Sequence, residues 1–437
     1  MSFADQLLCK LREKEAIIGV VGLGYVGLPL AVEKAKAGYQ VIGFDIQQKR
    51  VDMVNQGVNY IGDVVDEELA ELVETGNFQA TTDYSKVSQV DAVAICVPTP
   101  LDIYKQPDTS YVVSSATEIS KYLHKGMLVV LESTTYPGTT EEVLKPIFES
   151  TGLTCGEDFF IAYSPERVDP GNQFFKTKNT PKVVGGVTAT CTEVAAAMYR
   201  NVLKGEVHEV SSPAVAEMEK ILENTFRNIN IALANEMAIL CNKMGINVWE
   251  VIDAAATKPY GFMPFYPGPG VGGHCIPIDP WYLTWKAREY NYHTRLIETA
   301  GEINNSMPEF VVNRMMHILN KEGKALNGSK ILVLGVAYKK DIDDWRESPV
   351  IPILELLSDA GTEWSVVDPY VNRFKLAGEW VDTHNELDVT LLQEADLTLI
   401  TTDHSIMDIR MITNHAQVIF DTKNVLKKES HGKLYSL

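Results

Sequence analysis

The sequence predicts an α/β protein in which two parallel-sheet domains flank a helical middle segment. Short β-rich apolar runs alternate with helix-like segments over residues 16–210, and the same alternation returns from residue 329 onward. The residues between them carry long helical patterns instead. Alternating strands and helices favour a parallel, doubly wound sheet, because each helix packs on a face of the sheet. We therefore expect domains at residues 1–210, 211–325 and 326–437.

The first domain opens with a strand, a glycine turn, a helix and a second strand. These parts begin at Ala16 and read "AIIGVV", "GLGYVGLPLAVEKAKAG" and "YQVIGFD". Further strand-like runs follow with helix-like segments between most of them, namely "DAVAICVPTP", "MLVVLEST" and "FFIAYSPE".

The middle segment begins with one long helical pattern, "PAVAEMEKILENTFRNINIALANEMAILCNKMG". Pro213 suits the first turn of a helix, and Gly245 suits its C-terminal end. The last domain then repeats strand, helix and strand in "SKILVLGVAY", "SPVIPILELLSDAG" and "TEWSVVDPY". "ADLTLITTD" predicts a further strand, and the domain ends near "QVIFDTKNVL".

Charge and composition exclude several classes of partner. The 437 residues carry a net charge of -19, whereas nucleic acids and anionic membranes select basic surfaces, so we expect neither as a partner. No apolar run approaches the ~18 residues that cross a bilayer, and the N-terminus lacks a signal-peptide core, which predicts a cytoplasmic protein. The six cysteines include no CxxC pair, so we expect neither a metal site nor a disulfide framework.

The "GLGYVG" turn predicts a dinucleotide site in a Rossmann fold. Gly22 permits the tight turn, Gly24 lets a pyrophosphate approach the backbone, and Gly27 lets helix and strand pack closely. Asp45 ends the second strand 18 residues after Gly27, where a carboxylate can bind a ribose 2'-hydroxyl and would repel a 2'-phosphate. This pattern favours NAD over NADP. The alternative is a glycine turn with an N-capping acid.

Lys220, Asn224 and Asn228 are spaced four residues apart, so on a helix they share one face. A cation and amide donors on such a face could bind an oxyanion or sugar hydroxyls. The alternative is an exposed face on which Lys220 pairs with Glu217.

Two residues follow predicted strand ends, where parallel sheets carry their ligand crevices. Glu166 lies in "AYSPERVDPGN", and its alternative role is a surface turn residue that pairs with Arg167. Thr135 lies in "STTYPGTT" and could donate a hydroxyl to a ligand or a water, or be an ordinary turn threonine.

Cys275 lies in a run of glycines and prolines, "YPGPGVGGHCIPIDP", that favours neither helix nor strand. Backbone N–H groups and little side-chain bulk around a thiol suit close approach of a substrate and stabilisation of an oxyanion. Asp279 could take part in proton transfer, and Lys220 could supply the cation that activates the thiol. The alternative is a structural thiol.

Taken together, "GLGYVGLPLA", "SPERVDPGN", "KILENTFRNINIALANE", "GPGVGGHCIPIDPWYL" and "GVAYKKDIDDWRESP" resemble the UDP-sugar 6-dehydrogenases of the UDP-glucose/GDP-mannose dehydrogenase family. The resemblance implies an N-terminal Rossmann NAD-binding domain, a central helical dimerisation segment and a C-terminal Rossmann-like UDP-binding domain. It also implies oxidation of a sugar C6 alcohol to a carboxylate with two NAD per turnover, in a homodimer or a higher homo-oligomer.

The same resemblance implies roles for individual residues. Cys275 is the nucleophile that forms a thiohemiacetal and then a thioester, Lys220 and Asn224 hold the reacting oxygen, and Glu166, Thr135 and Asp279 position and deprotonate water. The implied NAD contacts are Gly22, Gly24, Tyr25, Val26, Gly27, Asp45, Arg50, Thr99, Thr135 and Arg346. The implied UDP-sugar contacts are Glu166, Arg167, Lys220, Asn224, Gly272 and Lys339, the last on the diphosphate.

Two residues of the cysteine motif bear on which sugar is bound. UDP-glucose enzymes of the human type have a lysine directly before the motif's aspartate, whereas this chain has Ile278. His274 precedes the cysteine, as in the branch that acts on UDP-N-acetylhexosamines. The resemblance favours UDP-N-acetylglucosamine, with the mannosamine and galactosamine epimers and UDP-glucose as alternatives, and a role in surface polysaccharide synthesis. A two-electron dehydrogenase without a thiol and a non-catalytic nucleotide-sugar sensor are the other classes we consider.

Overall fold

The computed structural model describes residues 1–62, 64–168, 172, 174–426 and 432–437. The chain forms two compact units. The first comprises Met1–Glu223 and Trp281–Tyr292, and the second comprises Asn224–Pro280 and His293–Leu437.

The first unit is built on a sheet with the strand order β3-β2-β1-β4-β5-β6-β7-β8. Neighbouring strands pair in parallel except for β6 and β7, which pair antiparallel. The strands are β1 (Ile17–Val21), β2 (Gln40–Phe44), β3 (Phe78–Thr81), β4 (Ala92–Ile95), β5 (Leu128–Leu131), β6 (Phe160–Tyr163), β7 (Lys182–Gly186) and β8 (Val207–Val210).

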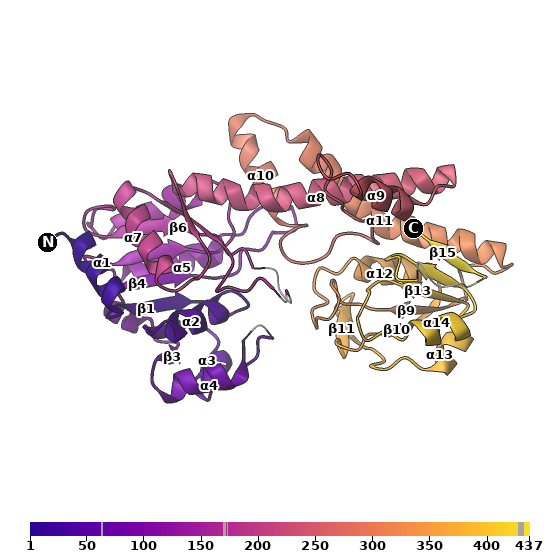
Figure 1. The fold of residues 1–437 in the computed structure, drawn as a ribbon, viewed down its shortest axis with the longest axis horizontal. Coiled ribbons are helices and arrows are strands. Elements are labelled where there is room, and N and C mark those ends of the chain that lie inside the picture. The colour runs from indigo at the N-terminus through magenta and orange to yellow at the C-terminus, as the bar shows by residue number, and fades with distance from the viewer. Residues whose placement is uncertain (63, 169–171, 173, 427–431) are drawn as a thin grey trace. The chain divides into compact units, whose positions relative to one another are not determined.

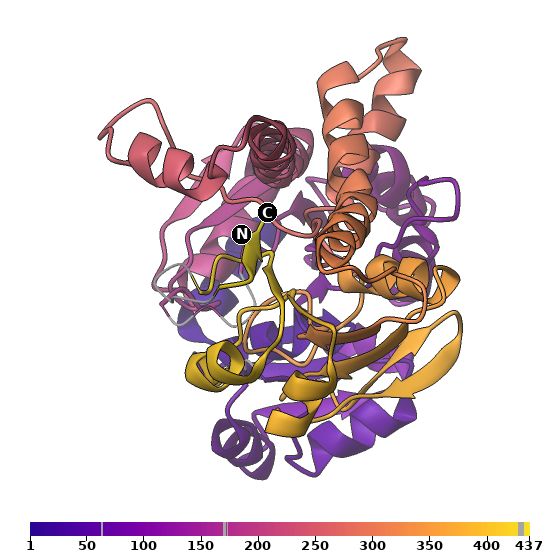
Figure 2. The same ribbon diagram turned by 90° about the vertical axis from the view of Figure 1, so that its right-hand side faces the viewer.

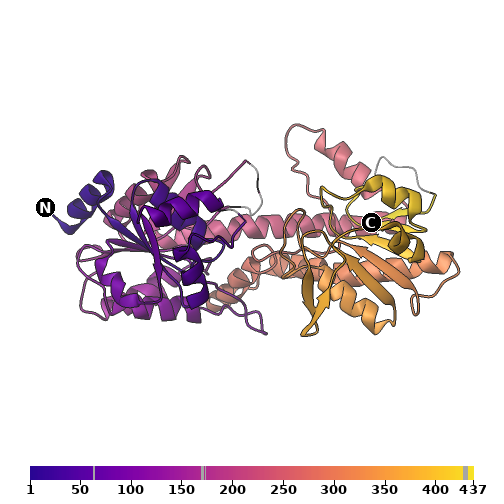
Figure 3. The same ribbon diagram turned by 90° about the horizontal axis from the view of Figure 1, so that it is seen from below.

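Helices lie on both faces of this sheet (Figure 3). Two of them touch through side chains, since Lys34 Nζ of α2 lies 3.5 Å from Met198 Sδ of α7. The helices are α1 (Phe3–Glu13), α2 (Gly27–Lys36), α3 (Gln48–Asn55), α4 (Asp66–Glu74), η1 (Tyr84–Gln89), α5 (Ser110–Ser120), η2 (Thr140–Leu144), α6 (Lys145–Glu149) and α7 (Ala189–Arg200).

The predicted long helix is α8 (Pro213–Met244), labelled in Figure 1. It begins at Pro213 and ends directly before Gly245, whose φ of 71° is the left-handed conformation that favours glycine after a helix. The other helices of the middle segment are α9 (Val248–Ala256), α10 (Asp279–Ala287), η3 (Arg288–Tyr290) and α11 (Arg295–Lys321).

The second unit is built on a parallel sheet with the strand order β10-β9-β13-β14-β15. Its strands are β9 (Lys330–Leu334), β10 (Glu363–Val367), β13 (Leu397–Ile400), β14 (Ile419–Asp421) and β15 (Leu434–Ser436), beside an antiparallel hairpin of β11 (Arg373–Leu376) and β12 (Glu379–Asp382). Its helices are α12 (Val350–Asp359), α13 (Val389–Glu394) and α14 (Ile409–His415).

Alternation along β9 builds a hydrophobic core on each face of the second sheet. Ile331 and Val333 belong to the core that includes α11 and α12 residues, whereas Leu332 and Leu334 belong to the core that includes α13 and α14 residues. Figure 2 shows the ribbons of the helices of this unit around its sheet. Successive side chains of a strand point to opposite faces, so a strand buried on both faces reads as an unbroken apolar run.

These observations confirm the predicted α/β class with parallel sheets. The antiparallel entry of β7 and the β11–β12 hairpin were not anticipated, because a pattern of alternating strands and helices carries no signal for either. The domain boundaries at residues 211 and 326 stay a prediction.

Candidate active site

The glycine turn after β1 has the geometry that a dinucleotide requires. Gly22 has a φ of 88°, and a Cβ there would lie 2.7 Å from the Cys96 carbonyl oxygen. A Cβ on Gly27 would lie 1.8 Å from the Gly22 carbonyl oxygen, so α2 can begin so close to the turn only at a glycine. Around Gly24, in contrast, a Cβ would meet no atom within 4 Å. The open side at Gly24 fits the pyrophosphate of NAD.

Tyr25 and Val26 complete this turn, with the tyrosine exposed and the valine half-buried. They precede α2, whose first N–H groups have no partner within the helix and can serve an anion.

Asp45 is buried at the end of β2, as expected for an acid that binds ribose. One carboxylate oxygen accepts the Leu23 N–H (2.9 Å), and the other accepts the Gln47 N–H (2.8 Å). The Arg50 guanidinium lies 3.4 Å from the first of these oxygens. Asp45 therefore orders the glycine turn and holds Arg50 beside the place where a ribose would lie. This donor set fits NAD.

Thr99 and Thr135 follow β4 and β5 at the same edge of the sheet. The Thr99 hydroxyl donates to the Thr134 carbonyl (2.6 Å), and the Thr99 carbonyl accepts from the Tyr282 hydroxyl. The Thr135 hydroxyl is fully buried and has no hydrogen-bond partner among the described residues. An orphaned buried hydroxyl is costly, which is the situation that a bound ligand or water relieves.

Glu166 follows β6 and is held at both carboxylate oxygens. Oε1 accepts the N–H groups of Arg167 and Val168, each at 2.8 Å, and Oε2 lies 3.5 Å from Lys182 Nζ. Lys220 Nζ donates to the Glu166 backbone carbonyl at 2.5 Å, so α8 and the loop after β6 meet at this glutamate. Asp169–Gly171 of the same motif lie outside the described residues.

The simpler pairings that the sequence allowed for these residues do not occur. Arg167 pairs with Glu223 and with Glu219 rather than with the Glu166 carboxylate. Lys220 is 7% exposed, and Glu217 is fully buried with its carboxylate on the N–H groups of Gly138 and Thr140. Burial raises the pKa of Glu217 to about 7. The face of α8 that carries Lys220 is therefore buried, and the alternative of an exposed salt-bridged face is wrong.

In the second unit, the loop that carries Cys275 is fixed to α8. Asn224 Nδ2 donates to Asp279 Oδ2 at 2.5 Å, and the two residues are 5% and 2% exposed. The N–H groups of Ile278 and Asp279 donate to the Cys275 carbonyl at 3.2 and 2.9 Å, which makes a tight turn at the start of α10. Asn228, one turn further along α8, donates to the Ile276 carbonyl (3.0 Å). The Cys275 residue itself is exposed.

A chain of buried asparagines anchors the other end of this loop. Asn304 on α11 donates to the Asn228 carbonyl (3.1 Å) and accepts from Asn235 Nδ2 (2.9 Å). The Asn235 carbonyl oxygen accepts the Gly268 N–H (3.0 Å). Asn235 of α8 thus satisfies a backbone N–H of the loop, and Asn304 of α11 holds the Asn235 amide in place.

The glycines of the loop are required by packing as well as by any ligand. A Cβ on Gly272 would lie 2.7 Å from Tyr338 Cβ, and one on Gly273 would lie 3.0 Å from the Tyr338 ring. A Cβ on Gly270 would likewise lie 2.7 Å from Pro349 Cβ. Tyr338 therefore occupies the space that side chains at positions 272 and 273 would need, and the implied contact of Gly272 with the UDP-sugar stays a prediction.

His274 and Arg346 share one carboxylate in the second unit. Asp344 lies 2.9 Å from His274 Nε2 and accepts from the Arg346 guanidinium at 2.9 and 2.8 Å. Burial alone would raise the pKa of Asp344, but these bonds hold it well below its usual range. Lys339 lies half-buried in the loop that follows β9, on the chain between Tyr338 and Asp344.

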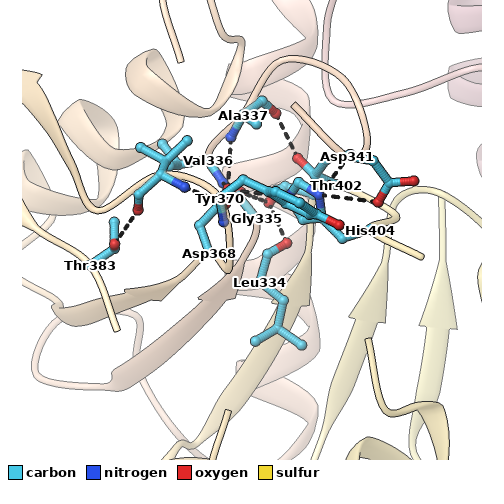
Figure 4. A network of polar contacts seen from close by, with 12 residues as sticks. Leu334, Gly335, Val336, Ala337, Asp341, Asp368, Tyr370, Thr383, Thr402 and His404 are labelled. Carbon is cyan, nitrogen blue, oxygen red and sulfur yellow. Dashed lines mark hydrogen bonds and ion pairs between the residues drawn. The ribbon is translucent and has the colours of Figure 1, made fainter. Parts of the chain in front are cut away.

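Asp368 ends β10 as Asp45 ends β2, but its carboxylate is committed to protein groups (Figure 4). It accepts the N–H groups of Val336 and Ala337, at 2.7 and 3.0 Å, and lies 3.2 Å from His404 Nε2. Burial opposes its ionisation, but His404 and these N–H groups lower the pKa of Asp368 overall. A cavity of about 270 Å³ opens at this edge beside His404. A Cβ on Gly335, directly after β9, would lie 2.4 Å from Thr402 Cβ, and the next helix, α12, begins only at Val350. The turn after β9 therefore lacks the open glycine and the adjoining helix start that the first unit presents.

Sequence reasoning missed the buried ions around Glu166. Lys182 at the start of β7 and Glu132 after β5 form an ion pair at 2.5 Å. The signal was present in "LEST" and "PKVV", where a charged residue flanks an apolar run, but such residues more often end a strand at the surface.

Neither a metal site nor a membrane span emerges from the described part of the chain. No group of three or more His, Cys, Asp or Glu side chains there could hold a metal ion. None of its helices combines the length and apolar character needed to cross a membrane.

Models of the UDP-glucose/GDP-mannose dehydrogenase family match the chain in three successive parts. The NAD-binding domain matches residues 16–203, the central domain residues 214–306 and the UDP-binding domain residues 332–428. The NAD-binding match contains the glycine turn and Asp45, in agreement with the fit of that turn to NAD.

Full-length relatives agree with these matches. A UDP-N-acetyl-D-glucosamine 6-dehydrogenase from Pseudomonas aeruginosa is 37% identical over 95% of this chain and 98% of its own. A UDP-N-acetyl-D-mannosamine dehydrogenase from Escherichia coli K12 is 39% identical over 94% and 99%. The solved structure of a UDP-D-ManNAc dehydrogenase from Pyrococcus horikoshii is 35% identical over 96% and 98%, with a TM-score of 0.88. The chain belongs to the UDP-glucose/GDP-mannose dehydrogenase family and is an NAD-dependent UDP-sugar dehydrogenase.

Proposed function

We propose that the chain oxidises the C6 alcohol of a UDP-N-acetylhexosamine, with UDP-N-acetylglucosamine favoured, to the uronate. One sugar, two NAD⁺ and one water give one uronate, two NADH and three protons. NAD supplies the hydride acceptor for both oxidations. Cys275 Sγ adds to the C6 aldehyde to form a thiohemiacetal, the second oxidation converts it to a thioester, and water releases the acid.

The observation that carries this proposal is the buried Asn224–Asp279 pair, which fixes the loop of the exposed Cys275 to α8. The 2.5 Å hydrogen bond holds the Asn224 amide of α8 on the Asp279 carboxylate, which lies four residues after Cys275, and the Asp279 N–H closes the turn on the Cys275 carbonyl. A two-electron alcohol dehydrogenase has no use for such a thiol, whereas a four-electron enzyme needs it to hold the aldehyde.

The remaining residues divide between the two oxidations and the hydrolysis. Lys220 lies one helical turn before Asn224 on α8, and we propose that both stabilise negative charge on the C6 oxygen. Glu166 and the Thr135 hydroxyl, which lacks a partner among the described residues, would position the hydrolytic water together with Asp279.

Contacts with the two nucleotides follow from the family resemblance. We assign NAD to Gly22, Gly24, Tyr25, Val26, Gly27, Asp45, Arg50, Thr99, Thr135 and Arg346. We assign the UDP-sugar to Glu166, Arg167, Lys220, Asn224, Gly272 and Lys339. The domains would comprise residues 1–210 for NAD, 211–325 for dimerisation and 326–437 for UDP, in a cytoplasmic homodimer or higher homo-oligomer that supplies a surface polysaccharide.

Ile278 and His274 support an acetylated sugar over UDP-glucose. Among the relatives, the names of those 37% and 39% identical divide between the glucosamine and the mannosamine epimers. UDP-N-acetylmannosamine is therefore the second candidate, and the residues around Cys275 do not separate the two.

A panel of UDP-sugars with product counting tests the proposal. The purified enzyme is incubated with NAD and limiting UDP-N-acetylglucosamine, UDP-N-acetylmannosamine, UDP-N-acetylgalactosamine or UDP-glucose, and NADH is measured at completion. We expect two NADH per molecule of UDP-N-acetylglucosamine. Turnover of UDP-glucose but of no acetylated sugar would overturn the choice of substrate, and one NADH per sugar would overturn the four-electron chemistry.

A further inference from the structure

A lysine on the neighbouring strand faces the Glu166 carboxylate. In the antiparallel β6–β7 pair, Ala162 lies opposite Gly186 and Tyr163 lies opposite Gly185. Continuing that register beyond β6 brings Lys182 opposite Glu166, and the Lys182 Nζ to Glu166 Oε2 distance is 3.5 Å. If β7 ran parallel to β6, its first residue would lie beside the start of β6, at the opposite edge of the sheet from Glu166. The reversed strand therefore delivers a cation to the edge where ligands bind.

Buried groups hold this cation in place. Lys182 Nζ is 2.5 Å from Glu132 Oε2, and the two side chains are 6% and 0% exposed. The Tyr199 hydroxyl donates to the other Glu132 oxygen, and Lys182 Nζ lies 5.2 Å from the centre of the Tyr199 ring. The ion pair with a buried carboxylate and the contact with an aromatic ring together restrict the lysine side chain to one conformation.

Glu166 is consequently fixed from two sides. The N–H groups of Arg167 and Val168 hold Oε1, while Lys182 faces Oε2. Burial alone would raise the pKa of Glu166, but Lys182 first, then these N–H groups and Lys220, lower it overall.

We propose that Lys182 is a positioning residue for the hydrolytic half of the reaction. It keeps Glu166 ionised and in one orientation, so that Glu166 can accept a proton from the water that attacks the Cys275 thioester. This inference rests on the proposed function. In the step, the water oxygen bonds to C6, the C6–Sγ bond breaks with its electron pair on the Cys275 sulfur, one water proton passes to Glu166 and the other is released as the carboxylate forms.

Several charged or titratable groups face this cluster and enter its pH dependence. They are Lys182 from β7, Glu132 after β5, Lys220 from α8, Arg167 with its partners Glu219 and Glu223, Lys34 from α2, Cys96 after β4 and Tyr199 from α7. Lys182 heads the charged groups that lower the pKa of Glu166, so its removal should dominate.

The decisive variant is the double substitution Lys182→Met with Glu132→Gln. Lys182→Met alone would leave the buried Glu132 carboxylate without its cation, which is strongly destabilising. The double substitution removes both charges, and the amide oxygen of the new glutamine side chain can still accept the hydrogen bond from the Tyr199 hydroxyl. The readout is the NADH burst and the steady-state rate as functions of pH. We expect the burst to persist, the acidic limb of the steady-state rate to move up by about 1 to 3 pH units, and a thioester on Cys275 to accumulate at low pH.

Two single substitutions serve as controls. Lys182→Arg keeps the cation and should leave the acidic limb near its wild-type position. Lys34→Met removes another buried lysine, whose Nζ lies 4.8 Å from the centre of the Tyr199 ring. It should move the limb much less than the double substitution does, because Lys182 and Lys220 are the lysines that lower the pKa of Glu166. A folded double variant with the wild-type limb and no accumulated thioester would show that Lys182 is only structural. Failure of the wild-type enzyme to make NADH from any UDP-sugar would instead overturn the proposed function.

Discussion

Gly24→Ala should separate NAD binding from folding. The residue has no positive φ, and a Cβ there meets no atom within 4 Å. Gly27→Ala is the matched contrast, because its Cβ would lie 1.8 Å from the Gly22 carbonyl oxygen. The two substitutions add the same methyl group three residues apart in one turn, but only the second is excluded by the protein itself.

The expected magnitudes follow from these distances. An alanine that fits without strain changes stability by about 0.4 to 1 kcal/mol, in the stabilising direction. The same methyl group would occupy the space that the pyrophosphate needs, and crowding of this kind costs about 1 to 3 kcal/mol. Because this cost arises only when NAD is bound, it weakens NAD binding about 5- to 150-fold. Gly27→Ala should fail at the folding stage instead.

Thermal unfolding and NADH fluorescence titration measure the two effects separately. We expect Gly24→Ala to unfold at or slightly above the wild-type temperature and to bind NADH at least 5-fold more weakly, which corresponds to about 1 kcal/mol. Binding of the UDP-sugar in the absence of cofactor should be unchanged. Wild-type NADH affinity in Gly24→Ala, or clear destabilisation, would refute the assignment of the open side of Gly24 to the pyrophosphate.

Three further substitutions test other parts of the account. Cys275→Ser should abolish uronate formation while leaving the unfolding temperature unchanged, since the residue is exposed; product analysis by mass spectrometry checks this. Asn235→Ala should lower stability by about 1 to 3 kcal/mol in denaturant unfolding, because the Gly268 N–H loses its buried acceptor. Asp344→Asn should cost about 1 to 2 kcal/mol at pH 7. The folded-state pKa of Asp344 is depressed, so its contribution is present above the unfolded value and is lost as pH falls. The difference in unfolding free energy between wild type and Asp344→Asn, measured across pH, should therefore begin to shrink below about pH 4 and continue to shrink as the pH falls toward the depressed folded-state pKa.

The elements with strong local signals could be predicted from the sequence. The glycine turn and the acid after β2 lie at a fixed spacing in one strand–helix–strand unit, in which Asp45 accepts the Leu23 N–H, and Pro213 and Gly245 mark the ends of α8 by their backbone preferences. The helical face of Lys220 and Asn224 also follows from spacing alone. Its burial does not, because the partners, Glu166 and Asp279, are distant in sequence.

Features that depend on pairing between distant segments could not be predicted. Nothing local in "KVVGG" says that β7 enters antiparallel, and only that register brings Lys182 to Glu166. The glycines before Cys275 were interpreted as room for a substrate, yet Tyr338 fills the space beside Gly272 and Gly273. A run of glycines indicates that another group lies close to the backbone there, but the sequence does not distinguish a ligand from a protein side chain.

The central claim is that Cys275 carries the sugar through the second oxidation, and its most direct test is the mass of the Cys275 peptide during turnover. Enzyme mixed with NAD and UDP-N-acetylglucosamine is quenched in acid within the first turnover, digested and examined by mass spectrometry. We predict a thioester adduct on Cys275 that appears with the second NADH and decays as the uronate forms. Formation of two NADH per sugar with Cys275 unmodified throughout, or by Cys275→Ser at the wild-type rate, would contradict the account.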